Sequence, residues 1–259
     1  MQPAKNKILL VIALLLSTAI NTYAQNAIKK AEIALSASYA KILDHEDSAY
    51  RYADKFRQEF TILLKNNPAT ISYNFKLLQD SSHCYVTTSA DGAFRVYSWD
   101  RWTGGSMHYF DAIYQYRTGE TVSTQAAVPI KGNPGTFCSK IYTASINGKA
   151  YYLAILNGIY SSRDAAQSVQ VFTITNGKLD DTTRIFKTKS KILNRIDVPF
   201  DFFSVVDRPE RPLELITYNE TSKEVYIPLV DKNGQVTHSN LIYRLTGDFF
   251  EYVGVAKSK

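Results

Sequence analysis

The chain has 259 residues and a formal net charge of +6, from 30 lysine and arginine residues against 24 acidic ones. No dense basic stripe or nucleic-acid-binding motif accompanies this charge, so the sequence argues against a nucleic-acid partner. Phosphate-cradling glycine motifs are absent and the four histidines have no metal-ligand spacing, so no cofactor and no metal site are predicted.

The first 24 residues have the three parts of a secretory signal peptide. Lys5 and Lys7 come first, Ile8 to Leu16 form a short apolar run, and Ala24 ends a cleavage site. The apolar run is too short to cross a bilayer, and no later stretch is long enough to do so. The sequence therefore predicts a periplasmic or secreted protein without a transmembrane segment, cleaved near Ala24.

Residues 25–68 carry the apolar spacing of two amphipathic helices, separated by the acidic run Asp44 to Asp47. Pro68 ends the second helix because proline cannot continue one. The apolar positions that recur every three or four residues are Ile28, Ala31, Leu35, Tyr39 and Ile42, then Ala49, Ala53, Phe56, Phe60 and Leu63. We expect this N-terminal helical segment to pack on one side of the domain that follows.

Residues 69–259 have the composition of a β-rich domain. β-branched and aromatic runs alternate with Asx-Gly pairs, which supply the positive φ angles of tight hairpin turns. The pairs begin at Asp91, Asn147, Asn157, Asn176 and Asn233. This pattern predicts an antiparallel meander of about nine to twelve strands.

Three segments of the β-rich domain share a strand-turn-strand rhythm. They run from Asp91 to Gly119, from Asn147 to Gly177 and, less regularly, from Leu213 to Gly247. Such a unit cannot bury both of its faces alone, so the pattern indicates repeated β units in a propeller-like array or in a closed or two-layered sheet.

The only two cysteines are Cys84 and Cys138. An even number in an exported protein favours a disulfide, which would close a loop of about 54 residues and contribute on the order of 4 kcal/mol. Two unpaired buried thiols are the alternative.

Aromatic residues are densest between Ala90 and Arg117. Trp99 and Trp102, helped by Tyr97, Tyr109 and Arg101, could form an aromatic platform for a sugar ring. Packing between strands is the favoured interpretation of these residues, because sheets use aromatic side chains as core material.

Catalytic chemistry finds less support. Ser106 and His108 stand two residues apart on an expected strand, which is long for a serine-imidazole hydrogen bond, and no nucleophile elbow surrounds them. A glycosidase would need two carboxylates facing each other across a cleft. The acidic residues in aromatic surroundings are Asp100, Asp111, Asp197 and Asp201. No catalytic residue is assigned.

The stretches SADGAFRVYSWDRWTGGSMHYF and KIYTASINGKAYYLAILNGIYSS resemble those of secreted proteins of no assigned function in Bacteroidota. This resemblance implies a periplasmic or extracellular address and no catalytic residue. With the residues above, it predicts a non-catalytic binding or interaction module at the cell envelope, whose partner is a glycan or an envelope protein. The alternatives are a secreted hydrolase of a glycan or envelope polymer, and a structural or assembly partner that docks through its helices.

Overall fold

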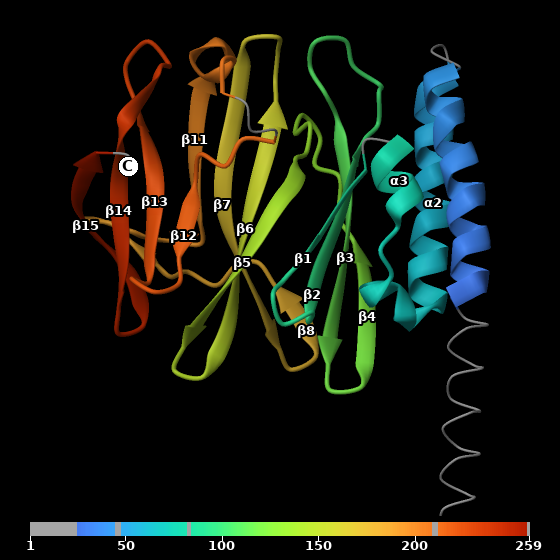
Figure 1. The fold of residues 1–259 in the computed structure, drawn as a ribbon, viewed down its shortest axis with the longest axis horizontal. Coiled ribbons are helices and arrows are strands. Elements are labelled where there is room, and N and C mark those ends of the chain that lie inside the picture. Colours follow the sequence, from blue (N-terminus) through green and yellow to red (C-terminus); the bar gives the residue numbers. More distant parts are fainter. Residues whose placement is uncertain (1–24, 45–47, 82–83, 209–211, 258–259) are drawn as a thin grey trace, which may run out of the picture.

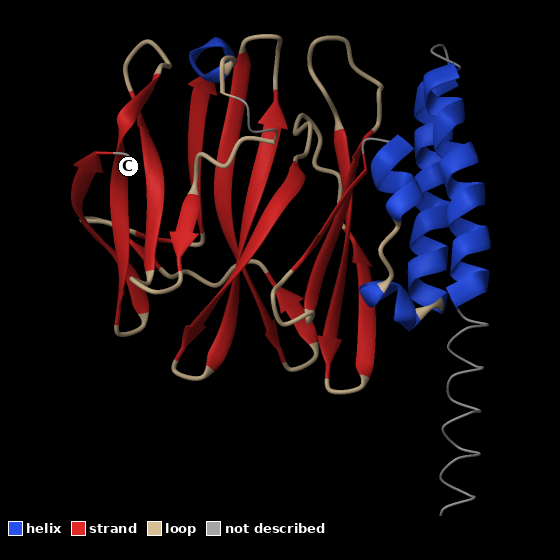
Figure 2. Cartoon of the chain, viewed as in Figure 1, coloured by secondary structure: helices blue, strands red, loops and turns tan. Residues whose placement is uncertain are grey.

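The protein is a row of layers in which helices cover one end of three successive β-sheets. The computed structural model describes residues 25–44, 48–81, 84–208 and 212–257. Figure 1 shows the helices on one side and the sheets following one another in chain order, and Figure 2 separates helix from strand. The proposed signal segment and His45 lie outside the described residues.

The two expected helices are present. The first covers residues 25–44, and α2 covers Ala49–Asn66 and ends two residues before Pro68. Their apolar stripes are buried as the spacing predicts, except that Ala31 is only half-buried and that Leu64 rather than Leu63 is fully buried. Two short elements follow that the sequence pattern did not indicate, namely η2 (Pro68–Ser72) and α3 (Lys76–Ser81). No helix in these described ranges is long and apolar enough to cross a membrane.

The first sheet is an antiparallel meander of four strands in the order β1-β2-β3-β4. Its strands are β1 (Cys84–Thr88), β2 (Phe94–Asp100), β3 (Phe110–Thr118) and β4 (Thr121–Ala126). Every residue of β2 is buried, which means that both faces of this sheet are covered.

The second sheet has the order β11-β7-β6-β5, with β8 paired to β7. Its strands are β5 (Phe137–Ile146), β6 (Lys149–Ile159), β7 (Asp164–Thr175), β8 (Lys178–Asp180) and β11 (Arg195–Asp201). Strand β11 is therefore an edge strand, and the short helix η3 (Phe202–Val205) follows it directly.

The third sheet has the order β10-β9-β15-β14-β13-β12. Its strands are β9 (Phe186–Lys187), β10 (Ile192–Leu193), β12 (Thr217–Asn219), β13 (Glu224–Val230), β14 (Val236–Thr246) and β15 (Phe249–Lys257). Strands β15 and β9 pair in parallel.

The mainly β prediction is confirmed, but the strand count and the single meander are not. The described residues form 15 strands in three separate sheets, and the chain passes through β9 and β10 of the third sheet before it returns to add β11 to the second. Asn147-Gly148 and Asn176-Gly177 are hairpin turns with positive φ at both residues, as expected. Asn157-Gly158 is not a turn, since both residues lie inside β6.

Three apolar cores fill the spaces between the layers. The first joins the helices to the first sheet and contains Phe56, Phe60 and Trp99. The second lies between the first and second sheets around Phe94, and the third lies between the second and third sheets around Phe186. The helices therefore share a core with the β-rich domain and do not leave their apolar stripes exposed.

Both cysteines are buried and free, so the expected disulfide is not formed. Cys84 packs in the core between the helices and the first sheet, whereas Cys138 packs in the core between the first and second sheets. The alternative of two unpaired buried thiols describes this structure. Burial raises the pKa of the Cys138 thiol to about 12 and also raises that of Cys84.

Candidate functional site

The longer loops of the three sheets lie at the same end of their strands, along one edge of the row. Tight turns connect β3 to β4, β5 to β6, β7 to β8 and β14 to β15, whereas the connections 101–109, 127–136 and 231–235 are longer. The backbone N–H of His108 donates to the Ile159 carbonyl, and that of Asp201 donates to the Gly234 carbonyl, so the long-loop ends of neighbouring sheets meet. Figure 1 shows these loops along one edge of the molecule. Rigid scaffolds commonly carry binding sites on such loops.

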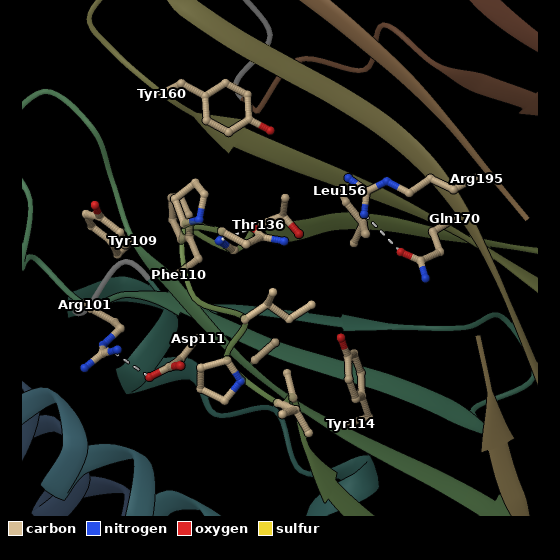
Figure 3. A pocket seen from close by; sticks show the side chains of 18 of the residues that line it. Arg101, Tyr109, Phe110, Asp111, Tyr114, Thr136, Leu156, Tyr160, Gln170 and Arg195 are labelled. Atoms are coloured by element: carbon tan, nitrogen blue, oxygen red, sulfur yellow. Dashed lines mark hydrogen bonds and ion pairs between the residues drawn. The ribbon is translucent and has the colours of Figure 1, made fainter. Parts of the chain in front are cut away.

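A cavity of about 310 Å³ opens at this end between the first and second sheets. We call it the first cavity. One wall comes from the start of β3 and the loop 127–136, and the other from β6, β7 and β11. Figure 3 shows this arrangement, with Asp111 and Tyr114 on the first-sheet side and Gln170 and Arg195 on the second-sheet side. Its volume is at the lower limit of small-molecule sites.

Arg101 and Asp111 form an ion pair on the first wall. The Nε atom of Arg101 lies 3.5 Å from Oδ2 of Asp111, and Nη1 of Arg57 lies 3.9 Å from Oδ1. The Asp111 side chain is only 6% exposed, and its Oδ2 accepts no hydrogen bond within the described chain. Burial raises the pKa of this carboxyl, although the two arginines act in the opposite direction.

The second wall carries a connected polar network. Arg195 donates to Asp197 at 2.7 Å, to Ser168 at 2.9 Å and to Gln170 at 3.1 Å. The Ser168 hydroxyl also donates to Asp197 at 2.7 Å. Because β7 and β11 are paired strands, these four side chains are fixed relative to one another before any ligand arrives.

Three tyrosines complete the cavity. Tyr109 lies at the end of the loop 101–109, Tyr114 on β3 and Tyr160 just after β6. Figure 3 places Tyr109 and Tyr160 on one side of the cavity and Tyr114 on another. Burial raises the pKa of Tyr114 to about 12, so its hydroxyl is protonated at neutral pH and can both donate and accept.

The structure separates the predicted aromatic platform into two parts. Trp99 and Tyr97 are fully buried in the helix-facing core, so they present no face to a ligand. Trp102 is 36% exposed, and its indole N–H donates to the Tyr39 hydroxyl at 3.0 Å. Of the predicted set, only Arg101 and Tyr109 line the first cavity.

The structure does not bring all the candidate catalytic residues into one site. Asp100 is held by the ring of His108 and by the backbone N–H of Trp102, which assigns it a structural role in the loop 101–109. Ser106 is exposed and, within the described chain, makes no hydrogen bond to His108. Asp111 and Asp197 line the same cavity, and Asp201 lines a neighbouring one.

Sequence reasoning missed Tyr160, Gln170 and Arg195. The alternation of Arg195 and Asp197 on one strand face was available as a signal, but nothing in the chain places that face opposite Asp111. The described residues contain no group of three or more histidine, cysteine, aspartate or glutamate residues that could hold a metal ion. No protein-family model matches the chain, and neither does any curated protein.

Proposed function

We propose that this protein is an exported, non-catalytic binding module of the cell envelope, and that the first cavity takes a neutral saccharide. The observation that carries the proposal is the polar lining of that cavity, where Arg101 with Asp111 and Arg195 with Asp197 stand among three tyrosines. The secretory signal in residues 1–24 supports the export.

The balance of charge favours a ligand without net charge. Each arginine on the cavity wall is matched by an aspartate, so a charged ligand would meet an already neutralised partner. Arginine supplies donors and carboxylate supplies acceptors, and the vicinal hydroxyls of a sugar ring need both. Tyrosine rings add broad apolar contact with a polar end, which suits the mixed surface of a pyranose.

The lining is also preorganised. Arg195 already makes three hydrogen bonds to neighbouring side chains, and Asp111 is enclosed by Arg101 and Arg57. A ligand therefore does not have to order these long side chains when it binds, which lowers the entropic cost of association.

The row of three sheets supports a role as a rigid scaffold that carries the binding loops. We propose that the three sheets are copies of one β unit in an open, propeller-like row, with the helices covering the free face of the first copy. The segments that share the sequence rhythm supply β2 with β3, β6 with β7 and β13 with β14. Assembly through the helices is less favoured, because the first sheet covers their apolar stripes.

A glycan hydrolase is the second candidate. Asp111, with its raised pKa, and Asp197 line one cavity, and glycosidases pair a protonated with an ionised carboxyl group. Binding is preferred, because both carboxylates lie beside arginines. Incubation with a bound oligosaccharide should release no reducing ends, whereas release that Asp111→Asn abolishes would establish the hydrolase.

The test is binding of mono- and disaccharides to the protein lacking residues 1–24, by glycan array and then by calorimetry. Tyr109→Ala removes an aromatic wall of the cavity and should weaken binding about tenfold, equivalent to about 1.4 kcal/mol. Tyr50→Ala is the matched control, because Tyr50 is an exposed tyrosine of α2 outside the cavity. Absence of any saccharide binding, or equal losses in both variants, would refute the proposal.

A further inference from the structure

A second cavity lies beside the first, between the second and third sheets. It has a volume of about 660 Å³ and is lined by the edge strand β11, by β13 and by the turn that follows β13. Tyr160 and Asp197 line both cavities. The two spaces are therefore neighbours along the same loop-rich end, with these two side chains between them.

We propose that the two cavities are one continuous groove for a linear, neutral oligosaccharide, which crosses the long-loop end from the first sheet to the third. This inference rests on the proposed function and adds to it that the ligand is a chain. A single sugar ring would fill one cavity and leave the other empty, whereas a chain passing Tyr160 would contact both.

An arginine–aspartate pair also occurs in the second cavity, whose lining further includes the carboxylates of Asp164 and Asp231. Arg163 donates from Nη2 to Oδ2 of Asp201 at 2.6 Å and from Nε to the same oxygen at 2.9 Å. Gln235 also donates to this carboxylate, at 3.1 Å. With the pairs Arg101–Asp111 and Arg195–Asp197, three arginine–aspartate pairs thus follow one another along the groove. A repeating polymer is the ligand that would use a repeated set of donors and acceptors.

The remaining lining of the second cavity is mostly apolar. Ile196, Phe200, Pro228 and Leu229 belong to it, and they come from the two facing strands β11 and β13. This surface suits the C–H faces of sugar rings, whose hydroxyls then point sideways to the charged pairs. Leu229 is 36% exposed, so a substitution there changes the groove without opening a core.

An extended peptide is a poorer occupant of the same groove. Peptides commonly add to a free sheet edge by a ladder of backbone hydrogen bonds, and β11 is such an edge. Pro199, in the middle of β11, has no N–H, and the N–H of Asp201 already donates to the Gly234 carbonyl at 2.8 Å. A ligand at this edge must therefore bind mainly to side chains and not to the backbone of β11, which favours a saccharide over a peptide.

The experiment measures affinity against chain length by calorimetry, using cello-, malto- and chito-oligosaccharides from the disaccharide to the hexasaccharide. We expect the hexasaccharide of the recognised series to bind at least tenfold more tightly than its disaccharide. Leu229→Arg fills the second cavity, so it should lower hexasaccharide affinity to that of the disaccharide and leave the disaccharide unchanged. Ile62→Arg, at an exposed apolar position of α2, is the matched control and should preserve the gain with length.

The outcomes separate this inference from the proposed function. Equal affinity for disaccharide and hexasaccharide, or a gain with length that survives Leu229→Arg in a folded variant, would overturn the groove and leave the first cavity as the whole site. Failure of every saccharide to bind would overturn both. If an extended peptide binds the wild-type protein but not the Leu229→Arg variant, the groove binds a peptide, and this result also overturns the inference. Melting temperatures of both variants report whether they fold.

Discussion

Replacing Phe60 with alanine tests whether the helices and the sheets are one folded unit. Phe60 is fully buried on α2. The centroid of its ring lies 5.3 Å from the ring centroid of Tyr97, 5.4 Å from that of Phe75, 5.6 Å from that of Phe56 and 5.7 Å from that of Trp99. Truncating a buried phenylalanine costs about 3–5 kcal/mol. Because four aromatic contacts are lost together, we expect a cost of about 4–5 kcal/mol in the free energy of unfolding.

The assay is urea unfolding followed separately by helical circular dichroism and by tryptophan fluorescence. Phe60→Ala should move both transitions together and lower the melting temperature by about 10 °C or more. Ile62→Ala, on the exposed side of the same helix, should change stability by less than about 0.5 kcal/mol. If the helical signal is lost in a separate early transition while the sheet signal keeps its wild-type midpoint, the shared core does not govern folding.

Three further outcomes follow from buried groups. Glu32 accepts from the backbone N–H groups of Leu77 and Leu78 and from Tyr73, so Glu32→Ala should cost about 3 kcal/mol by denaturant unfolding, and Glu32→Gln less. Thiol titration should find no reactive cysteine in the native protein and two reactive cysteines after unfolding without reductant. Finding none after unfolding would show that Cys84 and Cys138 form a disulfide. The pKa values of Tyr73 and Tyr114 are raised to about 12, mainly by burial. Their contribution to the free energy of unfolding should therefore be complete below about pH 10, the ordinary pKa of tyrosine, and should be lost as the pH rises toward 12. Denaturant unfolding measured at each pH tests this.

The helices were predictable because their signal is local. Spacing of three and four residues marks Ile28, Leu35, Tyr39 and Ile42, and all four are buried. Hairpin turns were predictable for the same reason, since an asparagine-glycine pair specifies its own backbone geometry. Asn157-Gly158 shows the limit, because the same pair lies within β6, where partners on β5 and β7 hold it in an extended strand.

The site was less predictable because its walls belong to different sheets. Alternation correctly groups Tyr97 and Trp99 on one face of a strand, but it cannot say which layer covers that face. The helices cover it, which turns the proposed platform into core. Arg101 and Tyr109 were recognised only as neighbours of the tryptophans. Their contribution to a cavity depends on the second sheet, whose Arg195 is almost a hundred residues away in the chain.

The loops that connect the strands are longer at one strand end than at the other, which explains why the two cavities lie at the same end. At the opposite strand ends, short turns such as Asn147-Gly148 and Asn176-Gly177 fix the register of their hairpins. At the cavity end the loop 127–136 folds back against the start of β3. Gly135 in this loop has a φ of +76°, and a Cβ atom there would come within 2.2 Å of the Phe110 carbonyl oxygen. This close contact sets the first wall of the cavity, so the same backbone constraint that closes the loop also positions the side chains that face Arg195.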